Sequence, residues 1–180
     1  MSFAVVSGPA NLSGNQLTLT GVGVVTVRAT QPGNASYEAA LAVERSFRVT
    51  ETLAHWRTGA FGESELADTA ISGPNADPDG DGLSNLLEYA LGLNPKNANT
   101  TGRPEISAVA GEWVYTYTRP ADRTDVSYAV ELSTNLTDWT TNGVTLEMVS
   151  SVDGVETWRA QPTAVGLTNI FFRLKVAESL

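Results

Sequence analysis

Hydrophobic and polar positions follow different patterns in three segments of the chain, residues 1–50, 51–101 and 102–180. In the first and third segments, apolar and polar residues alternate in short runs interrupted by Gly, Asn and Pro, which is typical of antiparallel strands. In the second segment, apolar residues recur at helical spacing. The pattern predicts a mainly β protein in which two β-sandwich-like modules are joined by a short helical segment.

The predicted strands lie in the first and third segments. Those of the first segment are residues 3–6, 16–19, 23–30 and 46–49. Those of the third segment are residues 112–118, 126–133, 144–150, 155–161 and 170–176. Asp153 and Gly154 predict a hairpin turn between two of these strands. In the last strand, one face is expected to point inward because it carries Ile170, Phe172, Leu174 and Val176.

Two short helices are predicted in the second segment. Thr52 can cap the first helix, which is expected to end at Gly59. Ser84 can cap the second helix, and Gly92 is expected to end it. The apolar stripe of the second helix consists of Leu86, Leu87, Ala90 and Leu91.

The composition is that of an ordinary soluble domain, because 42% of the residues are hydrophobic and the chain is long enough to bury one or two modest cores. The chain has no cysteine, which excludes disulfide bonds and thiol catalysis. No apolar stretch reaches the length of a membrane span, so no membrane insertion is expected.

Negative charge is concentrated in the second segment. The net charge is −9, and residues 58–95 contain seven carboxylates but no Lys or Arg. These acids are Glu63, Glu65, Asp68, Asp77, Asp79, Asp81 and Glu88. The rest of the chain carries thirteen acids and eleven bases, which leaves no basic face for nucleic acid or an anionic membrane.

Residues 77–88 fit the twelve-residue calcium-loop pattern, with acids at positions one, three and five, glycine at six and glutamate at twelve. A hard divalent cation prefers six to eight oxygen ligands. The predicted ligands of Ca²⁺ are the side chains of Asp77, Asp79, Asp81, Asn85 and Glu88 and the backbone carbonyl of Leu83. Without a cation these carboxylates repel one another, so metal binding is expected to be coupled to folding.

The loop residues 77–85, Asp-Pro-Asp-Gly-Asp-Gly-Leu-Ser-Asn, resemble the EF-hand-like calcium loop of bacterial thrombospondin type 3 repeats. Paired EF-hands usually have an aliphatic residue at loop position eight, where this chain has Ser84, and dockerins tend to carry two loops rather than one. The surrounding stretch, with Trp56, Phe61 and residues 86–95, resembles a segment near the carboxyl end of large secreted bacterial proteins.

The flanking segments carry two further resemblances. Residues 3–50 are similar to the later strands of a bacterial immunoglobulin-like repeat, and the resemblance implies that the earlier strands are missing from residues 1–50. The runs that carry this similarity are residues 5–10, 23–30 and 46–49. Residues 126–139 and 170–176 resemble the terminal sandwich that accompanies such calcium segments. A truncated repeat is expected to expose an unpaired strand edge, which favours strand-mediated self-association.

The resemblances imply a non-catalytic, calcium-binding structural or adhesive C-terminal region of a secreted or cell-surface bacterial protein. Calcium is expected to rigidify the helical connector, residues 51–101, between its two neighbours. The location implied is extracellular or cell surface, and the expected partner is a glycan or a cell-surface protein.

Two other functions stay open at this stage, a carbohydrate-binding module of a secreted enzyme and a secretion or anchoring tail. For the first, Trp113, Tyr115 and Tyr117 share one strand face, and planar rings stack on sugars; Trp139 and Trp158 can extend the platform. The opposite face, with Val114, Thr116 and Thr118, is expected to be solvated, which favours the three rings as core.

Catalysis is not expected. His55 is the only histidine, and no catalytic triad can be assembled from the spacing of the residues. The bond between Asp77 and Pro78 is prone to acid cleavage, and some bacterial modules cleave themselves at Asp-Pro when calcium binds. Proline at loop position two is also common in thrombospondin-like loops that stay intact.

Overall fold

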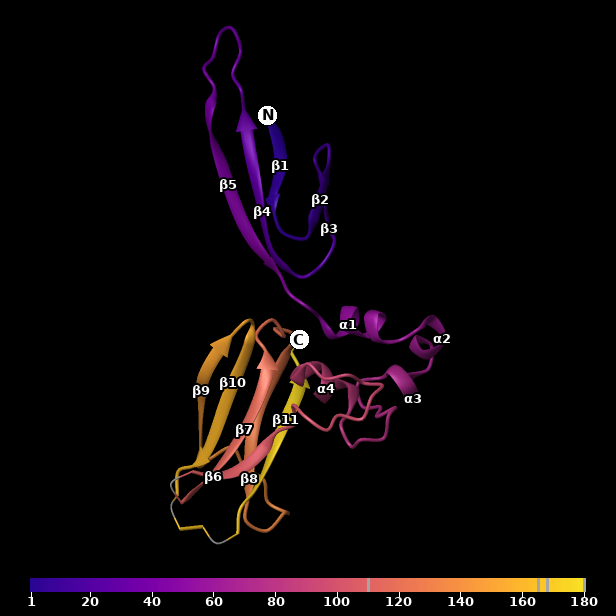
Figure 1. Ribbon diagram of the computed structural model, residues 1–180, viewed down its shortest axis with the longest axis vertical. Helices are drawn as coiled ribbons and strands as arrows, with labels where there is room; N and C mark the ends of the chain where they lie inside the picture. The colour runs from indigo at the N-terminus through magenta and orange to yellow at the C-terminus, as the bar shows by residue number, and fades with distance from the viewer. Residues whose placement is uncertain (110, 165, 168, 180) are drawn as a thin grey trace. The chain divides into compact units, whose positions relative to one another are not determined.

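A computed structural model describes residues 1–109, 111–164, 166–167 and 169–179 (Figure 1). The chain forms two compact units, Met1–Glu51 and Thr52–Leu180. Strands predominate and the few helices are short, which confirms a mainly β protein. None of the helices in the described part of the chain is long and apolar enough to cross a membrane.

The N-terminal unit is built on a three-stranded antiparallel sheet, in the order β1-β4-β5. These strands are β1 (Ser2–Ser7), β4 (Gly23–Gln31) and β5 (Ala40–Val49). A hairpin of β2 (Ala10–Ser13) and β3 (Gln16–Leu19) connects the first two. The sequence pattern predicted β3 with its observed bounds and missed β2, whose four residues include little apolar surface to mark it.

The two faces of this sheet differ in polarity. On one face Thr26 bonds to Ser46 at 2.8 Å and Arg28 pairs with Glu44 at 2.6 Å. On the other face Val25 is fully buried, while Phe47 beside it remains 41% exposed. The sheet is therefore amphipathic, and its apolar face is only partly covered within this unit.

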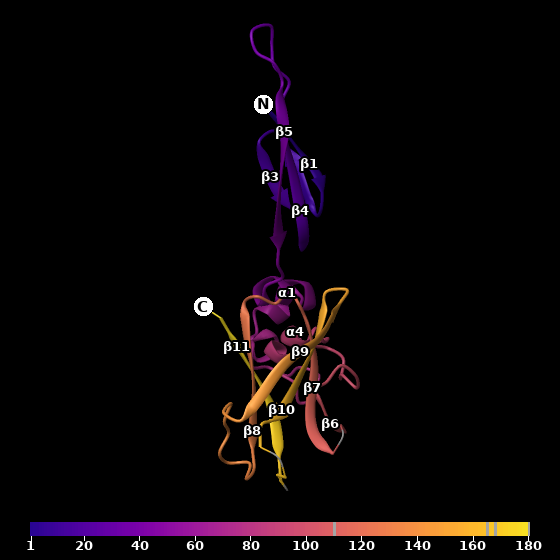
Figure 2. The same cartoon turned by 90° about the vertical axis from the view of Figure 1, so that its left-hand side faces the viewer.

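The second unit contains two antiparallel sheets that share a core (Figures 1 and 2). One has the order β6-β7-β10-β9 and the other pairs β11 with β8. The strands are β6 (Glu105–Val109), β7 (Glu112–Pro120), β8 (Val126–Ser133), β9 (Val144–Val152), β10 (Val155–Pro162) and β11 (Phe171–Glu178). The buried core residues are Leu91, Tyr115, Tyr117, Val130, Ala160 and Phe172.

Most strand predictions for this unit agree with the structure to within two residues at each end, and the inward face of β11 is confirmed by burial of Phe172. The hairpin between β9 and β10 also forms as predicted, with positive φ at Asp153 and Gly154. The pattern missed β6, all of whose described residues are exposed, so its apolar side chains follow no clear inward face.

The structure corrects two expectations for β7. Val114 was expected on a solvated face, yet it is 1% exposed on a strand that lies between β6 and β10. Trp113 was expected in the core, yet it is 44% exposed near the start of the strand, opposite the small side chain of Ala108. Tyr115 and Tyr117 are buried as expected.

Four short helices precede the sheets of the second unit. They are α1 (Leu53–Ala60), α2 (Glu63–Leu66), α3 (Thr69–Ser72) and α4 (Asn85–Leu91). Helix α1 begins after Thr52, whose Oγ1 accepts the His55 N–H at 3.2 Å, and it ends one residue beyond the expected Gly59. Helix α4 has the expected Ser84 cap and ends at Gly92 in the left-handed conformation. Helices α2 and α3 were not predicted, because each is a single turn.

Helices α1 and α4 are bound to the sheets through Asp125. Its Oδ2 accepts the N–H of Leu53 at 2.7 Å, and its Oδ1 accepts the hydroxyl of Tyr89 at 2.5 Å. The hydroxyl of Tyr128 on β8 donates to the carbonyl of Ala90 at 2.9 Å. The predicted connector and the predicted C-terminal sandwich lie in one compact unit. Helix α4 contributes to both hydrophobic clusters of this unit, with Leu91 in one and Tyr89 and Ala90 in the other.

Replacing Asp125 by Ala is expected to lower the free energy of unfolding of the second unit by about 3 kcal/mol, because two part-buried donors lose their acceptor. Urea unfolding, monitored by tryptophan fluorescence, measures this loss, because Trp56 packs on Tyr89. The matched control is Asp122→Ala, which removes an ion pair to Arg123 at 3.3 Å and is expected to cost less than about 1 kcal/mol. Equal losses in the two variants would contradict this role of Asp125.

Candidate metal centre

The acidic loop spans residues 77–83, between α3 and α4, and backbone hydrogen bonds close it at its base. The N–H of Asn85 donates to the carbonyl of Ala76 at 2.8 Å, and the N–H of Leu86 donates to the carbonyl of Pro74 at 2.9 Å. Gly82 has φ of 88°, the left-handed conformation that the sharp bend at loop position six requires. The loop is thus held in a tight turn at the N-terminus of α4.

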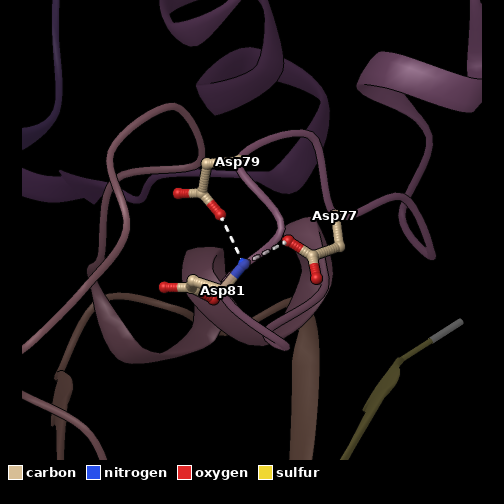
Figure 3. A group of neighbouring side chains, drawn as sticks. All are labelled: Asp77, Asp79 and Asp81. Atoms are coloured by element: carbon tan, nitrogen blue, oxygen red, sulfur yellow. Dashed lines mark hydrogen bonds between the residues drawn. The ribbon is translucent and has the colours of Figure 1, made fainter.

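Three aspartate carboxylates converge in this turn. One oxygen from each of Asp77, Asp79 and Asp81 lies within 4.8 Å of the other two. Figure 3 shows the backbone N–H of Asp81 shared between Asp77 Oδ1 at 3.2 Å and Asp79 Oδ1 at 3.1 Å. Asp77 also accepts the N–H groups of Gly80 and Gly82, at 3.0 and 2.9 Å. Backbone donors therefore hold like charges close together.

Glu88 brings a fourth carboxylate to the loop from the first turn of α4. Its side chain is fully buried, and Oε1 accepts a hydrogen bond from Asn99 Nδ2 at 2.7 Å. The same nitrogen lies 3.3 Å from Asp81 Oδ2, which places the two carboxylates side by side. Burial, followed by the charges of Asp79 and Asp81, raises the pKa of Glu88 to about 7.

Asp81 is ionised at neutral pH despite its low exposure. Burial acts to raise its pKa, but the N–H groups of Asn99 and Leu83 and the Arg103 guanidinium together lower it to about 2. The Asn99 N–H lies 2.6 Å from Oδ2, and Arg103 Nη2 lies 3.0 Å from Oδ1. Asp81 therefore keeps a full negative charge beside the Glu88 carboxyl.

Three buried oxygens of the predicted ligand set have no hydrogen-bond partner among the described residues. They are Asp79 Oδ2, Asn85 Oδ1 and Glu88 Oε2. All three are acceptors, and a buried acceptor without a donor or a cation is costly. A fourth buried atom without such a partner is a donor, Arg57 Nε, on a side chain that bonds to Ser72. The donor set of the loop, oxygen only and rich in carboxylates, fits a hard divalent cation.

The other two predicted ligands are placed less directly. Asn85 is fully buried, but its Nδ2 donates to the carbonyls of Ile71 and Gly73, each at 2.8 Å, so its amide anchors the end of α3. The N–H of Leu83 donates to Asp81 Oδ1 at 2.9 Å. The structure thus brings together Asp77, Asp79, Asp81 and Glu88, while ligation by Asn85 and by the Leu83 carbonyl stays a prediction.

Sequence reasoning missed two residues that contact the loop, Asn99 and Arg103. Besides its bond to the Asp81 carboxylate, Arg103 donates to the backbone carbonyl of Asp81 at 2.5 Å and to that of Asn99 at 2.7 Å. No periodicity marks residues 96–103. The sequence offered one signal for these contacts, because Lys96 and Arg103 are the first two bases after the acidic run. In the structure both pair with acids of that run, Lys96 with Glu65 at 2.6 Å and Arg103 with Asp81 at 3.0 Å.

Comparison with known proteins adds no assignment. No protein-family model matches this chain, and neither a curated protein nor a solved structure matches it.

The aromatic face considered for sugar binding is not an exposed platform. Tyr115 and Tyr117 are buried in the core between the sheets. Trp158 is covered by the Arg119 guanidinium, 4.7 Å from the ring centre, and Trp139 by that of Arg173 at 4.3 Å. The acidic loop is thus the more completely assembled of the two candidate sites.

In the presence of a chelator, the free energy of unfolding is expected to fall by about 2 kcal/mol as pH rises from 5 to 8. The pKa of Glu88 is raised from 4.5 to about 7 in the folded protein. Protonation of Glu88 therefore stabilises the folded state fully below pH 4.5, and this stabilisation is lost as pH rises through 7. Urea unfolding at several pH values measures this change.

The Glu88→Gln variant is expected to remove most of that pH dependence, because the amide does not titrate. Glu63→Gln is the matched control, because Glu63 is an exposed glutamate of the same acidic run. This variant is expected to leave the pH dependence of the free energy of unfolding unchanged. An unchanged pH dependence in Glu88→Gln would show that Glu88 is not the group whose protonation stabilises the folded state.

Proposed function

We propose that this chain is a non-catalytic, calcium-binding structural or adhesive region of a secreted or cell-surface bacterial protein. The observation that carries the proposal is the buried Oε2 of Glu88, which lies beside three converging aspartates and has no hydrogen-bond partner in the described part of the chain. Such an oxygen needs a cation or a proton, and the loop spacing is that of a calcium ligand set.

The chemistry of the site favours calcium over magnesium and zinc. Four carboxylates and no histidine or thiolate surround the loop, which disfavours zinc because it prefers nitrogen and sulfur ligands. Magnesium demands octahedral geometry and keeps several of its waters, whereas calcium accepts many protein oxygens in an irregular arrangement. Arg103 offsets one of the four negative charges, and a bound Ca²⁺ would offset two more.

Calcium in this position has a structural effect on the second unit. A cation held by the loop and by Glu88 would connect the loop to α4, whose Leu91 lies in the core between the sheets. Through Asp81 it would also order Asn99 and Arg103, which precede β6. We therefore propose that calcium rigidifies the helical segment that follows the N-terminal unit, by completing the second unit to which that segment belongs.

The proposed location is extracellular or at the cell surface. Calcium sites of modest affinity fill where calcium is millimolar, as it is outside the cell. Because the chain has no cysteine, a metal ion takes the stabilising role that disulfides have in many secreted proteins. The proposed adhesive partner is a glycan or a cell-surface protein.

Calorimetric titration of the chelator-stripped protein is expected to show one calcium site. At free calcium 100 times the dissociation constant, binding should raise the free energy of unfolding by about 2.7 kcal/mol. Thermal melts with and without calcium measure the same gain.

Asp79→Asn is expected to weaken calcium binding by at least about tenfold, because it removes the charge of one proposed ligand. Asp68→Asn is the matched control: it makes the same change in the same acidic run, at the cap of α3 and outside the cluster. The proposal fails if the parent protein shows neither heat nor a shift in melting temperature, or if the two variants bind calcium equally.

A further inference from the structure

Strand β5 is an exposed edge of the N-terminal sheet. It lies at one end of the strand order β1-β4-β5, and nine of its ten residues are exposed. An edge strand presents backbone donors and acceptors that a second strand can pair with. The register of β5 against β4 is regular from Val43 to Val49, so the residues on each face of this stretch are defined.

Charged residues alternate with apolar ones in a specific order along this stretch. Glu44, Ser46 and Arg48 occupy the polar face, opposite Arg28, Thr26 and Val24 of β4. The other face carries Val43, Arg45, Phe47 and Val49. Glu44 and Arg48 have opposite charges and are equally spaced about Ser46.

We propose that β5 pairs antiparallel with β5 of a second copy of this chain, with Ser46 opposite Ser46 on the two-fold axis. This register places Glu44 of each copy opposite Arg48 of the other. On the other face it places Arg45 opposite Phe47 and Val43 opposite Val49. Every pair occurs twice, as a closed two-fold contact requires.

Neighbouring registers lack this complementarity. With the axis at Arg45, two arginines face each other, and with the axis at Glu44, two glutamates do; like charges directly opposite are destabilising. With the axis at Phe47, the two rings face each other, but Glu44 then faces Thr50 and no charge pair forms. The other edge strand, β1, has no charged residue and no comparable pattern.

The proposed pairing continues contacts that exist within one copy. Arg28 already pairs with Glu44 at 2.6 Å, so Arg48 of the second copy would extend a charge ladder across three strands. Thr26 already bonds to Ser46 at 2.8 Å, so the two copies would align four hydroxyls across the axis. The result is a six-stranded sheet that leaves β1 at each edge. This contact lies within the unit Met1–Glu51 and is independent of the proposed calcium site.

Sedimentation velocity of the full chain over a range of concentrations tests the association. The parent protein is expected to form dimers, and Arg48→Glu is expected to weaken them about tenfold or more, because two attractive charge pairs become repulsive. Arg48→Lys keeps the charge and is expected to keep the dimer. A parent protein that stays monomeric, or an Arg48→Glu variant that associates equally well, would overturn the proposal.

Disulfide trapping tests the register, since the chain contains no other cysteine. In Ser46→Cys the two thiols would face each other, and either type of antiparallel pair places the Cα atoms within the range of about 4.4–6.8 Å that a disulfide needs. In Ala42→Cys, the matched control, the two thiols would be eight residues apart along the strands, about 26 Å. We expect oxidation to cross-link Ser46→Cys and leave Ala42→Cys monomeric. Equal cross-linking of the two, or cross-linking of Phe47→Cys in place of Ser46→Cys, would overturn this register.

Discussion

The second unit contains a buried carboxyl group, that of Glu88, and the described residues give a hydrogen-bond partner to only one of its two oxygens. Glu88 is fully buried, its Oε1 has one partner in Asn99, and its Oε2 has none among the described residues. Three aspartates beside it add negative charge in a tight turn. A group in this position is neutral at low pH or is bound by a cation, because a bare charge there is costly. Under the proposed function, calcium binding is therefore coupled to the folding of this unit.

Helix α4 connects the acidic loop to the rest of the unit. Glu88 faces the aspartates, the neighbouring Tyr89 bonds to Asp125, and Leu91 enters the core between the sheets. Within seven residues the helix therefore contacts the acidic loop, helix α1 through Asp125 and both sheets. Short helices are marginal in isolation, so tertiary contacts of this kind must hold α4 in place. The contacts of α4 thus connect the acidic loop to the core between the two sheets.

Sequence alone predicted the features whose signals are local. The acidic spacing of residues 77–88, the Ser84 cap and the Gly92 terminus lie within a few positions of one another, and the structure contains each of them. The approach of Asn99 and Arg103 to Asp81 could not be predicted, because it depends on how residues 96–103 fold back over the loop. The exposure of Trp113 and the burial of Val114 were predicted wrongly, because the alternation of residues along one strand does not show which tertiary contacts cover each side chain.

The most direct test of calcium as the completing element is a crystal structure of the protein grown with calcium, with the ion located by its anomalous signal. We expect one ion within about 2.3–2.6 Å of carboxylate oxygens of Asp77, Asp79, Asp81 and Glu88. Glu88 Oε2, which has no partner among the described residues, should be among the ligands. A calcium-saturated crystal without an ion at the loop, or with an ion that Glu88 does not contact, would contradict the account.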